Sequence, residues 1–337
     1  MQKRFTLKDV AIKAKTSIRT ASRVINDSNL VNPKTKEKVL NVIKELNYSP
    51  NIIARSLKSK SSKTIGVIIL DIYSPFFSAL IRGIESIATQ HDYSVIICES
   101  QYDVRLENKH LKTLIDRMVD GIIINPASRT YNNIKNIADQ GVKIVILGHP
   151  EFFNINISSV YFDEYEGMRI AIQHLVDNGH KKILFINGDI ECISKNLRLK
   201  GYKDAIEKNN IPFKDELIFK GKVDIEGGYN ISDGIFKSGL DFSAIMCFND
   251  LIAMGILKYC HENNINIPKD YSLMGFDDIF CTSLLNPPLT TVHQPKNYLG
   301  KIVGELLINK LNDINIDNQH IKIPPTLVIR ESVKKIN

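Results

Sequence analysis

The chain has 337 residues, of which 43% are hydrophobic, and a formal net charge of +7. This length allows a large buried core and predicts more than one domain. No run approaches eighteen apolar residues, and the first residues lead into polar, helix-like sequence rather than an apolar signal segment. The sequence therefore excludes a membrane-spanning protein and predicts a cytoplasmic one. The five cysteines lack CxxC spacing and are predicted to be reduced core thiols.

The positive charge is concentrated near the N-terminus. The first 63 residues carry fifteen Lys and Arg against four acidic residues, a net +11, so the remaining 274 residues carry about −4. A short basic segment attached to a slightly acidic body predicts a polyanionic partner for that segment.

This basic segment has the pattern of three short helices. Thr6 and Asp9 have the spacing of a helix N-cap, and an apolar stripe at helical spacing follows them. A second helix is predicted over 17–26. A third is predicted to begin at Asn32 and Pro33, a capping residue followed by a residue suited to the first helical position. Two short helices joined by a tight turn, with a third closing the core, predict a helix-turn-helix unit.

The outward residues of the second predicted helix are short, polar or basic, as a helix in a DNA major groove requires. Arg19 can reach guanine O6 and N7 in a bidentate manner. The alternative is a solvated basic bundle without a nucleic-acid role. The residues predicted to contact DNA from this unit are Thr6, Ser17, Ile18, Arg19, Thr20, Ser22, Arg23 and Asn26.

The segments 6–11, 20–26 and 46–51 resemble the DNA-binding head of the LacI/GalR family of transcriptional regulators, and the resemblance covers nearly the whole chain. Ala21 stands where many members have Val and keeps the packing role. In this family the segment that aligns with 49–63 is a hinge that folds when two copies meet on DNA, and the leucine aligned with Leu57 enters the minor groove. The alternative is that Leu57 packs the hinge against the body. The hinge residues implied to contact DNA are Asn51, Ala54, Leu57 and Lys58.

From residue 64 onward, apolar strand-like runs alternate with amphipathic helical runs. Continuous apolar strands separated by helices predict parallel sheets covered on both faces, and two sets of strands predict two similar lobes. The predicted strands are 65–70, 94–98, 121–125 and 143–147, then 183–186, 244–247 and 271–275, and finally 326–329.

The predicted fold is therefore α/β: a helix-turn-helix head and hinge helix joined to a two-lobed, doubly wound domain like the periplasmic binding proteins. The predicted boundaries are 1–48 for the head, 49–63 for the hinge, 64–162 plus 293–322 for the N-terminal lobe and 163–292 plus 323–337 for the C-terminal lobe.

Motifs of enzymatic chemistry are absent from the sequence. There is no GxGxxG, GxxxxGK[ST], HExxH or GxSxG, and no Cys/His cluster has metal-ligand spacing, so we predict no enzyme, cofactor or metal. A secreted sugar-binding protein would also fit the predicted lobes, but its sequence would begin with a signal peptide.

Polar residues at predicted strand ends are the ligand candidates. Asn125, Asn249 and Asp277 each follow or end an apolar run, and amides and carboxylates fixed there suit the hydroxyls of a sugar. Taken alone, any one of them is better explained as a helix cap. The family resemblance implies ligand roles for Arg198, Asn249, Asp277 and Gln294. Ring-stacking roles are predicted for Phe76, Phe77 and Phe162, with core packing as the alternative for the last two.

One departure affects the predicted site. Gly148 falls where the lactose and ribose repressors have an aspartate, and His149 is expected to substitute. Some segments resemble the maltose-type members of the family and others the ribose and purine members. The effector is therefore predicted only as a sugar or small sugar-like metabolite. A purine corepressor and a phosphoprotein partner remain as alternatives.

The predicted function is a homodimeric repressor of a palindromic operator, with induction expected and the opposite sign left open. The chain has no heptad tail, which favours a dimer over a tetramer. The competing class is a cytoplasmic sugar-binding module or sugar-acting enzyme whose basic head adheres to nucleic acid without sequence preference.

Overall fold

The computed structural model describes residues 5–25, 30–48, 61–127, 132–150, 156–312 and 316–336. The chain divides into two compact units, Met1–Ser62 and Lys63–Asn337, and each is described by itself. None of the helices in these ranges combines the length and apolar character that a bilayer crossing needs.

The first unit is a bundle of three helices: α1 (Leu7–Lys13), α2 (Ile18–Ile25) and α3 (Pro33–Glu45). Thr6 and Asp9 form the predicted capping box, in which Asp9 N donates to Thr6 Oγ1 and Thr6 N donates to the Asp9 carboxylate at 2.7 Å. Asn32 caps α3 by accepting a hydrogen bond from the Lys34 backbone. The three predicted helices are confirmed, with α2 beginning one residue later than predicted. The buried core of the bundle is Val10, Ala11, Ala14, Ala21, Val24, Val39 and Val42.

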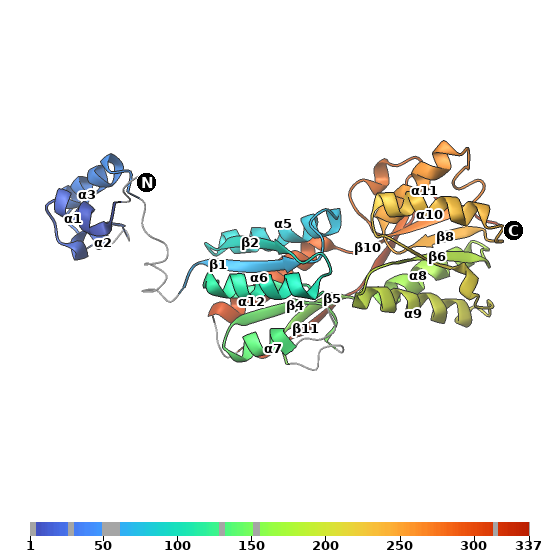
Figure 1. Ribbon diagram of the computed structural model, residues 1–337, viewed down its shortest axis with the longest axis horizontal. Coiled ribbons are helices and arrows are strands. Elements are labelled where there is room, and N and C mark those ends of the chain that lie inside the picture. Colours follow the sequence, from blue (N-terminus) through green and yellow to red (C-terminus); the bar gives the residue numbers. More distant parts are fainter. Residues whose placement is uncertain are drawn as a thin grey trace. The chain divides into compact units, whose positions relative to one another are not determined.

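The second unit contains two six-stranded sheets (Figure 1). The strands of the first sheet are β1 (Thr64–Ile69), β2 (Ser94–Glu99), β3 (Gly121–Ile124), β4 (Lys143–Leu147), β5 (Ser159–Phe162) and β11 (His320–Ile323). The strands of the second are β6 (Ile183–Gly188), β7 (Ile218–Gly221), β8 (Ala244–Cys247), β9 (Ser272–Asp277), β10 (Thr290–His293) and β12 (Thr326–Val328).

The two sheets have matching strand orders, β11-β5-β4-β3-β1-β2 and β12-β10-β9-β8-β6-β7. All pairs in the first sheet are parallel. In the second, β10 and β12 alone are antiparallel. The central strands β3 and β8 are buried at every residue because helices cover both faces, as the continuous apolar runs predict.

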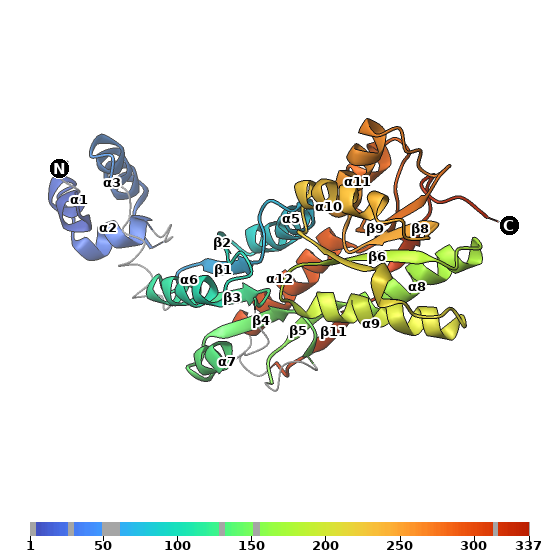
Figure 2. The same cartoon turned by 45° about the vertical axis from the view of Figure 1, so that its right-hand side comes forward.

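Each face of each sheet carries a pair of helices. The helices are α5 (Pro75–Gln90), α6 (Val104–Asp116), α7 (Asn132–Asp139), α8 (Glu164–Asp177), α9 (Ile193–Lys208), α10 (Ile225–Lys237), α11 (Asp250–Glu262) and α12 (Lys296–Asn312), with 3-10 turns η2 (Asp215–Leu217) and η3 (Thr282–Leu284). α5 and α12 share one apolar cluster with the first sheet, and α6 and α7 share another on its opposite face. The second sheet lies between α8 with α9 and α10 with α11, as Figures 1 and 2 show.

We call the first sheet with α5, α6, α7 and α12 the N-terminal lobe, and the second sheet with α8 to α11 the C-terminal lobe. The chain passes between them three times: from β5 to α8, from β10 to α12, and from β11 to β12. Both lobes are therefore assembled from segments far apart in the sequence.

Glycines let helices on the same sheet face approach closely. A Cβ on Gly300 of α12 would lie 2.1 Å from the Leu80 carbonyl of α5, and one on Gly83 would lie 2.2 Å from the Asn297 carbonyl. The C-terminal lobe repeats the device, since a Cβ on Gly255 would lie 2.1 Å from the Ile225 carbonyl. These helix pairs pack backbone to backbone, and no side chain fits at their crossing points.

Four strands were not predicted from the sequence: β5, β7, β10 and β11. β7 and β11 are edge strands and are only partly buried, so they lack a continuous apolar run. β9 also ends two residues later than predicted, which makes Asp277 its last residue.

Candidate functional site

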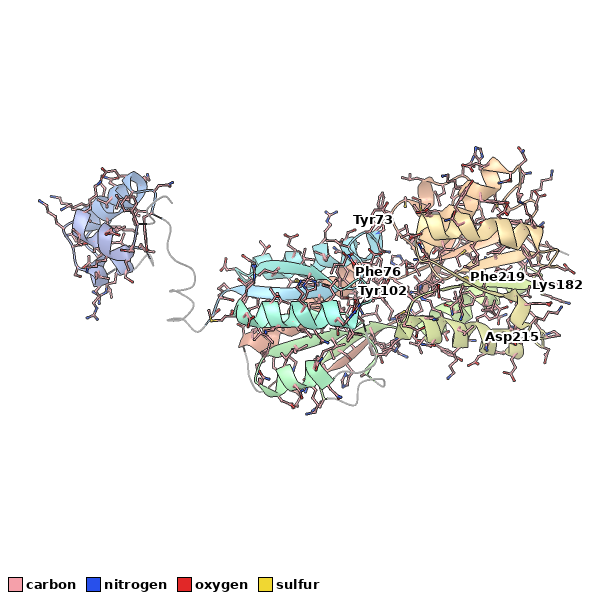
Figure 3. All side chains as sticks on the ribbon, in the orientation of Figure 1. Tyr73, Phe76, Tyr102, Lys182, Asp215 and Phe219 are labelled. Carbon is pink, nitrogen blue, oxygen red and sulfur yellow. The ribbon has the colours of Figure 1, made fainter. Side chains whose placement is uncertain are left out.

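A cavity lies between the two lobes, where the carboxyl ends of their strands meet. It encloses about 960 Å³ of empty space, with the open solvent at its mouth included. Residues that follow β1, β3 and β4 line it from the N-terminal lobe, and residues that follow β6 and β8 line it from the C-terminal lobe. Figure 3 places two of its lining residues, Phe76 and Tyr102, at the junction of the lobes.

Arg198 is the central cation of this cavity. Its guanidinium lies between two aromatic rings, 4.3 Å from the Phe248 centroid and 3.8 Å from the Phe276 centroid. One terminal nitrogen donates to the Phe248 carbonyl and the other lies 3.4 Å from Asp277 Oδ1. Its Nε is buried without a hydrogen-bond partner among the described residues. A buried donor without a partner is costly, so Arg198 is poised to donate to a ligand.

Asp277 is held from three sides in an unusual backbone conformation. Its φ of +109° is in the region that L residues rarely adopt, which occurs mostly at functional sites. Gln294 Nε2 donates to Asp277 Oδ1 at 2.8 Å, beside the contact from Arg198. The buried ammonium of Lys296 donates to the backbone carbonyls of Asp277, Asp278 and Gln294, and burial lowers the pKa of Lys296. The position of this carboxylate is thus fixed before any ligand binds.

Protonation of Asp277 is expected to make stability depend on pH. Burial raises the pKa of Asp277 from 3.8 to about 6, although Arg198 and Lys296 favour its charged form. Because the folded-state value exceeds the unfolded one, the stabilising contribution is complete below about pH 3.8 and is lost as pH rises through about 6. Relative to Asp277→Asn, the wild type should lose up to about 3 kcal/mol of unfolding free energy between pH 4 and 7. Urea denaturation across this range measures it, and a constant difference between the two proteins would contradict it.

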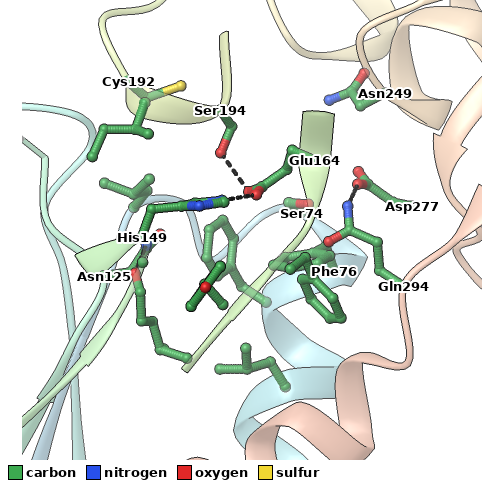
Figure 4. A pocket seen from close by; sticks show the side chains of 18 of the residues that line it. Ser74, Phe76, Asn125, His149, Glu164, Cys192, Ser194, Asn249, Asp277 and Gln294 are labelled. Atoms are coloured by element: carbon green, nitrogen blue, oxygen red, sulfur yellow. Dashed lines mark hydrogen bonds and ion pairs between the residues drawn. The ribbon is translucent and has the colours of Figure 1, made fainter. Parts of the chain in front are cut away.

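Glu164 and its partners form a second polar cluster in the cavity (Figure 4). Glu164 begins α8, and its Oε2 accepts a hydrogen bond from His149 Nε2 while its Oε1 accepts one from Ser194 Oγ at 2.9 Å. Burial opposes ionisation of Glu164, but the hydrogen bond and charge of His149, with Arg198 nearby, hold its pKa below the usual value. Sequence reasoning found His149 and missed Glu164, because it follows β5, a strand that was not predicted.

The two asparagines at strand ends differ in what they can offer a ligand. Asn125 Nδ2 donates to the Leu147 carbonyl at 2.6 Å, and its Oδ1 has no partner among the described residues. Asn249 caps α11: its Oδ1 accepts from Ile252 N and its Nδ2 donates to the Val223 carbonyl, both at 2.9 Å. The helix-cap explanation therefore holds for Asn249, although its side chain also lines the cavity.

The three predicted stacking residues form one aromatic group. The Phe76 ring meets Phe77 edge-on at 5.0 Å and Phe162 at 6.1 Å. Phe77 and Phe162 are buried in the core of the N-terminal lobe and contribute only part of their surface to the cavity, whereas Phe76 is partly exposed. Tyr102, which the sequence reasoning missed, also lines the cavity. Its loop, with φ near +50° at Gln101 and near +60° at Tyr102 itself, carries no apolar or strand signal.

The predicted DNA-contact residues of the three-helix unit lie on and beside α2. Ser17, Ile18 and Arg19 are exposed on its first turn, and Ser17 Oγ accepts a hydrogen bond from Thr20 N at 3.0 Å. Ser22 and Arg23 are half-buried. Thr6 is exposed and its hydroxyl belongs to the capping box of α1. Asn26, Asn51, Ala54, Leu57 and Lys58 lie outside the described residues.

Metal-binding arrangements are not found in the described part of the chain. No group of three or more His, Cys, Asp or Glu side chains there could hold a metal ion. The five cysteines are all free, with Cys247 and Cys260 buried.

Comparison with known proteins relates both units to bacterial regulators. Residues 6–51 match the family described as "Bacterial regulatory proteins, lacI family", and residues 172–333 match the "Periplasmic binding protein-like domain". The HTH-type transcriptional repressor PurR of Histophilus somni is 33% identical over 332 residues, which cover 98% of this chain and 99% of the relative.

Two solved structures are also similar. The Lac repressor dimer bound to operator and the anti-inducer ONPF is 28% identical with a TM-score of 0.85, covering 98% of this chain and all of that one. A LacI family regulator from Enterococcus faecium with bound ribose is 27% identical with a TM-score of 0.73, covering 81% of this chain and all of that one.

Proposed function

The chain belongs to the LacI family of bacterial regulatory proteins, and from that premise we propose that it is a transcriptional repressor whose operator affinity is controlled by a small sugar-like effector in the cavity. The main support for an effector site comes from Arg198, a buried cation whose Nε–H lacks a partner among the described residues. Such a group is stabilised by a ligand oxygen placed against it.

A sugar-like effector fits the chemistry of the cavity. Arg198, Asp277, Gln294 and Asn125 present polar groups in fixed positions, and the partly exposed ring of Phe76 offers an apolar surface for the C–H face of a sugar ring. The ribose-bound relative supports the same class of ligand. Asn249 contributes mainly by positioning α11.

The proposal that the protein binds DNA rests on the basic three-helix unit. Ser17, which precedes α2, and Ile18 and Arg19 on its first turn are exposed, and we infer that they read base edges in a major groove while the surrounding Lys and Arg side chains contact phosphates. Two copies reading a palindrome require a homodimer, as in the operator-bound Lac repressor dimer. A protein that binds an operator works at the chromosome, so we infer a cytoplasmic location.

Exposed apolar side chains on the second unit are consistent with self-association. Tyr73, which follows β1, and Phe280 and Leu284, which follow β9, are each 78% exposed. A second copy that covers these side chains would remove them from water.

Effector and operator are coupled through the relative position of the lobes. Occupation of the cavity favours one arrangement of the two lobes, and the effector weakens operator binding by as much as it prefers the DNA-free arrangement.

The proposal is tested by fluorescence anisotropy on DNA from the gene's own upstream region and on scrambled DNA, at physiological salt, with a panel of sugars and purines. Selective binding released by a sugar is the expected result. Tightening by a purine would instead identify a corepressor. Equal binding to both DNAs, unaffected by every compound, would contradict the proposal and leave only electrostatic adhesion.

Arg19→Ala is expected to weaken operator binding by about 5- to 150-fold, the loss of one bidentate base contact, and to reduce preference for the operator over scrambled DNA. Arg105→Ala serves as the matched control, because the Arg105 side chain is exposed on α6 and pairs with Asp103. The same anisotropy titration measures both variants. If Arg19→Ala weakened both DNAs equally, Arg19 would be a phosphate contact instead.

A further inference from the structure

Several side chains that face the cavity have acceptor capacity left. Asn125 and Gln294 each donate an amide N–H to the protein, to the Leu147 carbonyl and to Asp277, and each has an amide oxygen without a partner among the described residues. Asp277 Oδ2 is in the same state, since its hydrogen bonds go to Oδ1. A ligand that satisfies these oxygens must be rich in hydroxyl or N–H donors.

Glu164 adds a charged acceptor to the cavity wall. Ser194 and His149 each use one of its carboxylate oxygens, and a carboxylate offers about four acceptor positions, so about two remain. The side chain is 12% exposed, and it lines the cavity. Because its pKa is held below the usual value by His149, Glu164 is an anion and accepts without donating at neutral pH.

Arg198 does not give the cavity an unpaired positive charge. It is the one Lys or Arg among the described residues that line the cavity. Its guanidinium is already paired with the Asp277 carboxylate and also donates to the Phe248 carbonyl. The charge that would attract an anionic ligand is therefore already balanced inside the cavity wall, while its Nε–H can still donate to a neutral ligand oxygen. Lys296 donates to three backbone carbonyls.

We propose that Glu164, oriented by His149 and Ser194, is the specificity-determining residue of this cavity, and that it selects an uncharged, hydroxyl-rich ligand against a phosphorylated or carboxylated one. A hydroxyl of the ligand donates to the free acceptor positions of the carboxylate, whereas an anionic group placed beside the carboxylate meets a fixed like charge. Glu164 thereby supplies the hydroxyl acceptor that Gly148 cannot, and His149 acts through Glu164 as its positioning residue. This inference rests on the proposed effector function.

Isothermal titration calorimetry on the full chain tests it with matched pairs: D-ribose and D-ribose 5-phosphate, D-glucose and D-glucose 6-phosphate, and D-glucose and D-glucuronate. For a pair that binds, we expect the neutral sugar to bind at least about tenfold more tightly than its anionic partner, because juxtaposed like charges cost several kcal/mol. Glu164→Gln should reduce that ratio at least about tenfold, since it keeps the shape of the side chain and removes its charge.

Two further variants separate charge from structure. Glu166 lies on the same helix as Glu164 and is paired with Arg169, so Glu166→Gln should keep the wild-type ratio of neutral to anionic sugar affinity. Ser194→Ala keeps the Glu164 charge and removes one of its partners, so it should weaken the neutral sugar and still exclude the anionic one. This variant tests the charge if Glu164→Gln fails to fold.

Tighter binding of the phosphorylated or carboxylated partner, or an unchanged ratio in Glu164→Gln, would overturn the assignment of Glu164 and leave the effector function standing. Binding of neither member of any pair, with operator affinity unaffected by all of them, would overturn the sugar-like effector itself and this inference with it.

Discussion

Arg198→Ala should bind operator DNA as tightly as the wild type and lose its response to effector. The guanidinium contacts Asp277 and the Phe248 carbonyl, and its Nε–H has no partner among the described residues and can donate to a ligand. Removing one partner of a buried charged pair costs about 2–5 kcal/mol in binding, equivalent to a loss of effector affinity of about 30- to several-thousand-fold. Calorimetry with the effector and anisotropy with the operator measure the two properties separately.

Arg169→Ala is the matched control for this variant. Arg169 lies on the neighbouring helix α8 and its guanidinium is paired with Glu166, so this loss should not alter effector affinity. An Arg198→Ala protein that is still released from the operator at wild-type effector concentrations would refute the placement of the effector against Arg198.

Gly300→Val should destabilise the second unit by at least about 3 kcal/mol, which corresponds to a fall in Tm of roughly 6–12 °C. A Cβ at this position would lie 2.1 Å from the Leu80 carbonyl and 3.0 Å from the Gly83 Cα. Both neighbours are backbone atoms of α5, so relief requires α5 and α12 to separate. Thermal and urea denaturation measure the loss.

Gly234→Ala is the control, because a Cβ there meets nothing within 4 Å and the residue lies within α10. It should leave stability unchanged or raise it by about 0.5–1 kcal/mol, the ordinary advantage of Ala over Gly in a helix. Equal effects of the two substitutions would mean that intrinsic helix propensity, rather than the close approach of α5 and α12, requires Gly300.

Local rules predicted the elements whose signals are carried by neighbouring residues. The capping residues Thr6 and Asn32 set the beginnings of α1 and α3, and the continuous apolar run of β3 marks a strand covered on both faces. β10 (Thr290–His293) and β11 (His320–Ile323) were not predicted, because each is only four residues long and contains polar residues. Their conformation depends on pairing with strands that are distant in the sequence. Tertiary pairing, not local preference, selects the strand there.

The candidate site likewise contains residues that local rules predicted and residues that they did not. The rule that ligands bind at the carboxyl ends of parallel strands identified Asn125 and Asp277, and the structure places both in the cavity wall. The rule does not show which side-chain atoms already form hydrogen bonds within the protein. The capping hydrogen bond of Asn249 and the His149–Glu164 pair are therefore seen only in the three-dimensional structure. Applied after β5, the same rule would have identified Glu164.

The threading of the chain has a consequence for its synthesis on the ribosome. The outermost strands of the two sheets, β11 and β12, both come from His320–Val328, whereas the three-helix unit is complete within the first 62 residues. During translation the DNA-reading head can therefore fold long before either sheet of the regulatory domain can be completed. A polypeptide released before His320 would keep the head but lack the strands that pair with β5 and β10, and the edges of these two strands would be left as templates for aggregation. Only a chain that includes His320–Val328 therefore joins DNA reading to a complete regulatory domain.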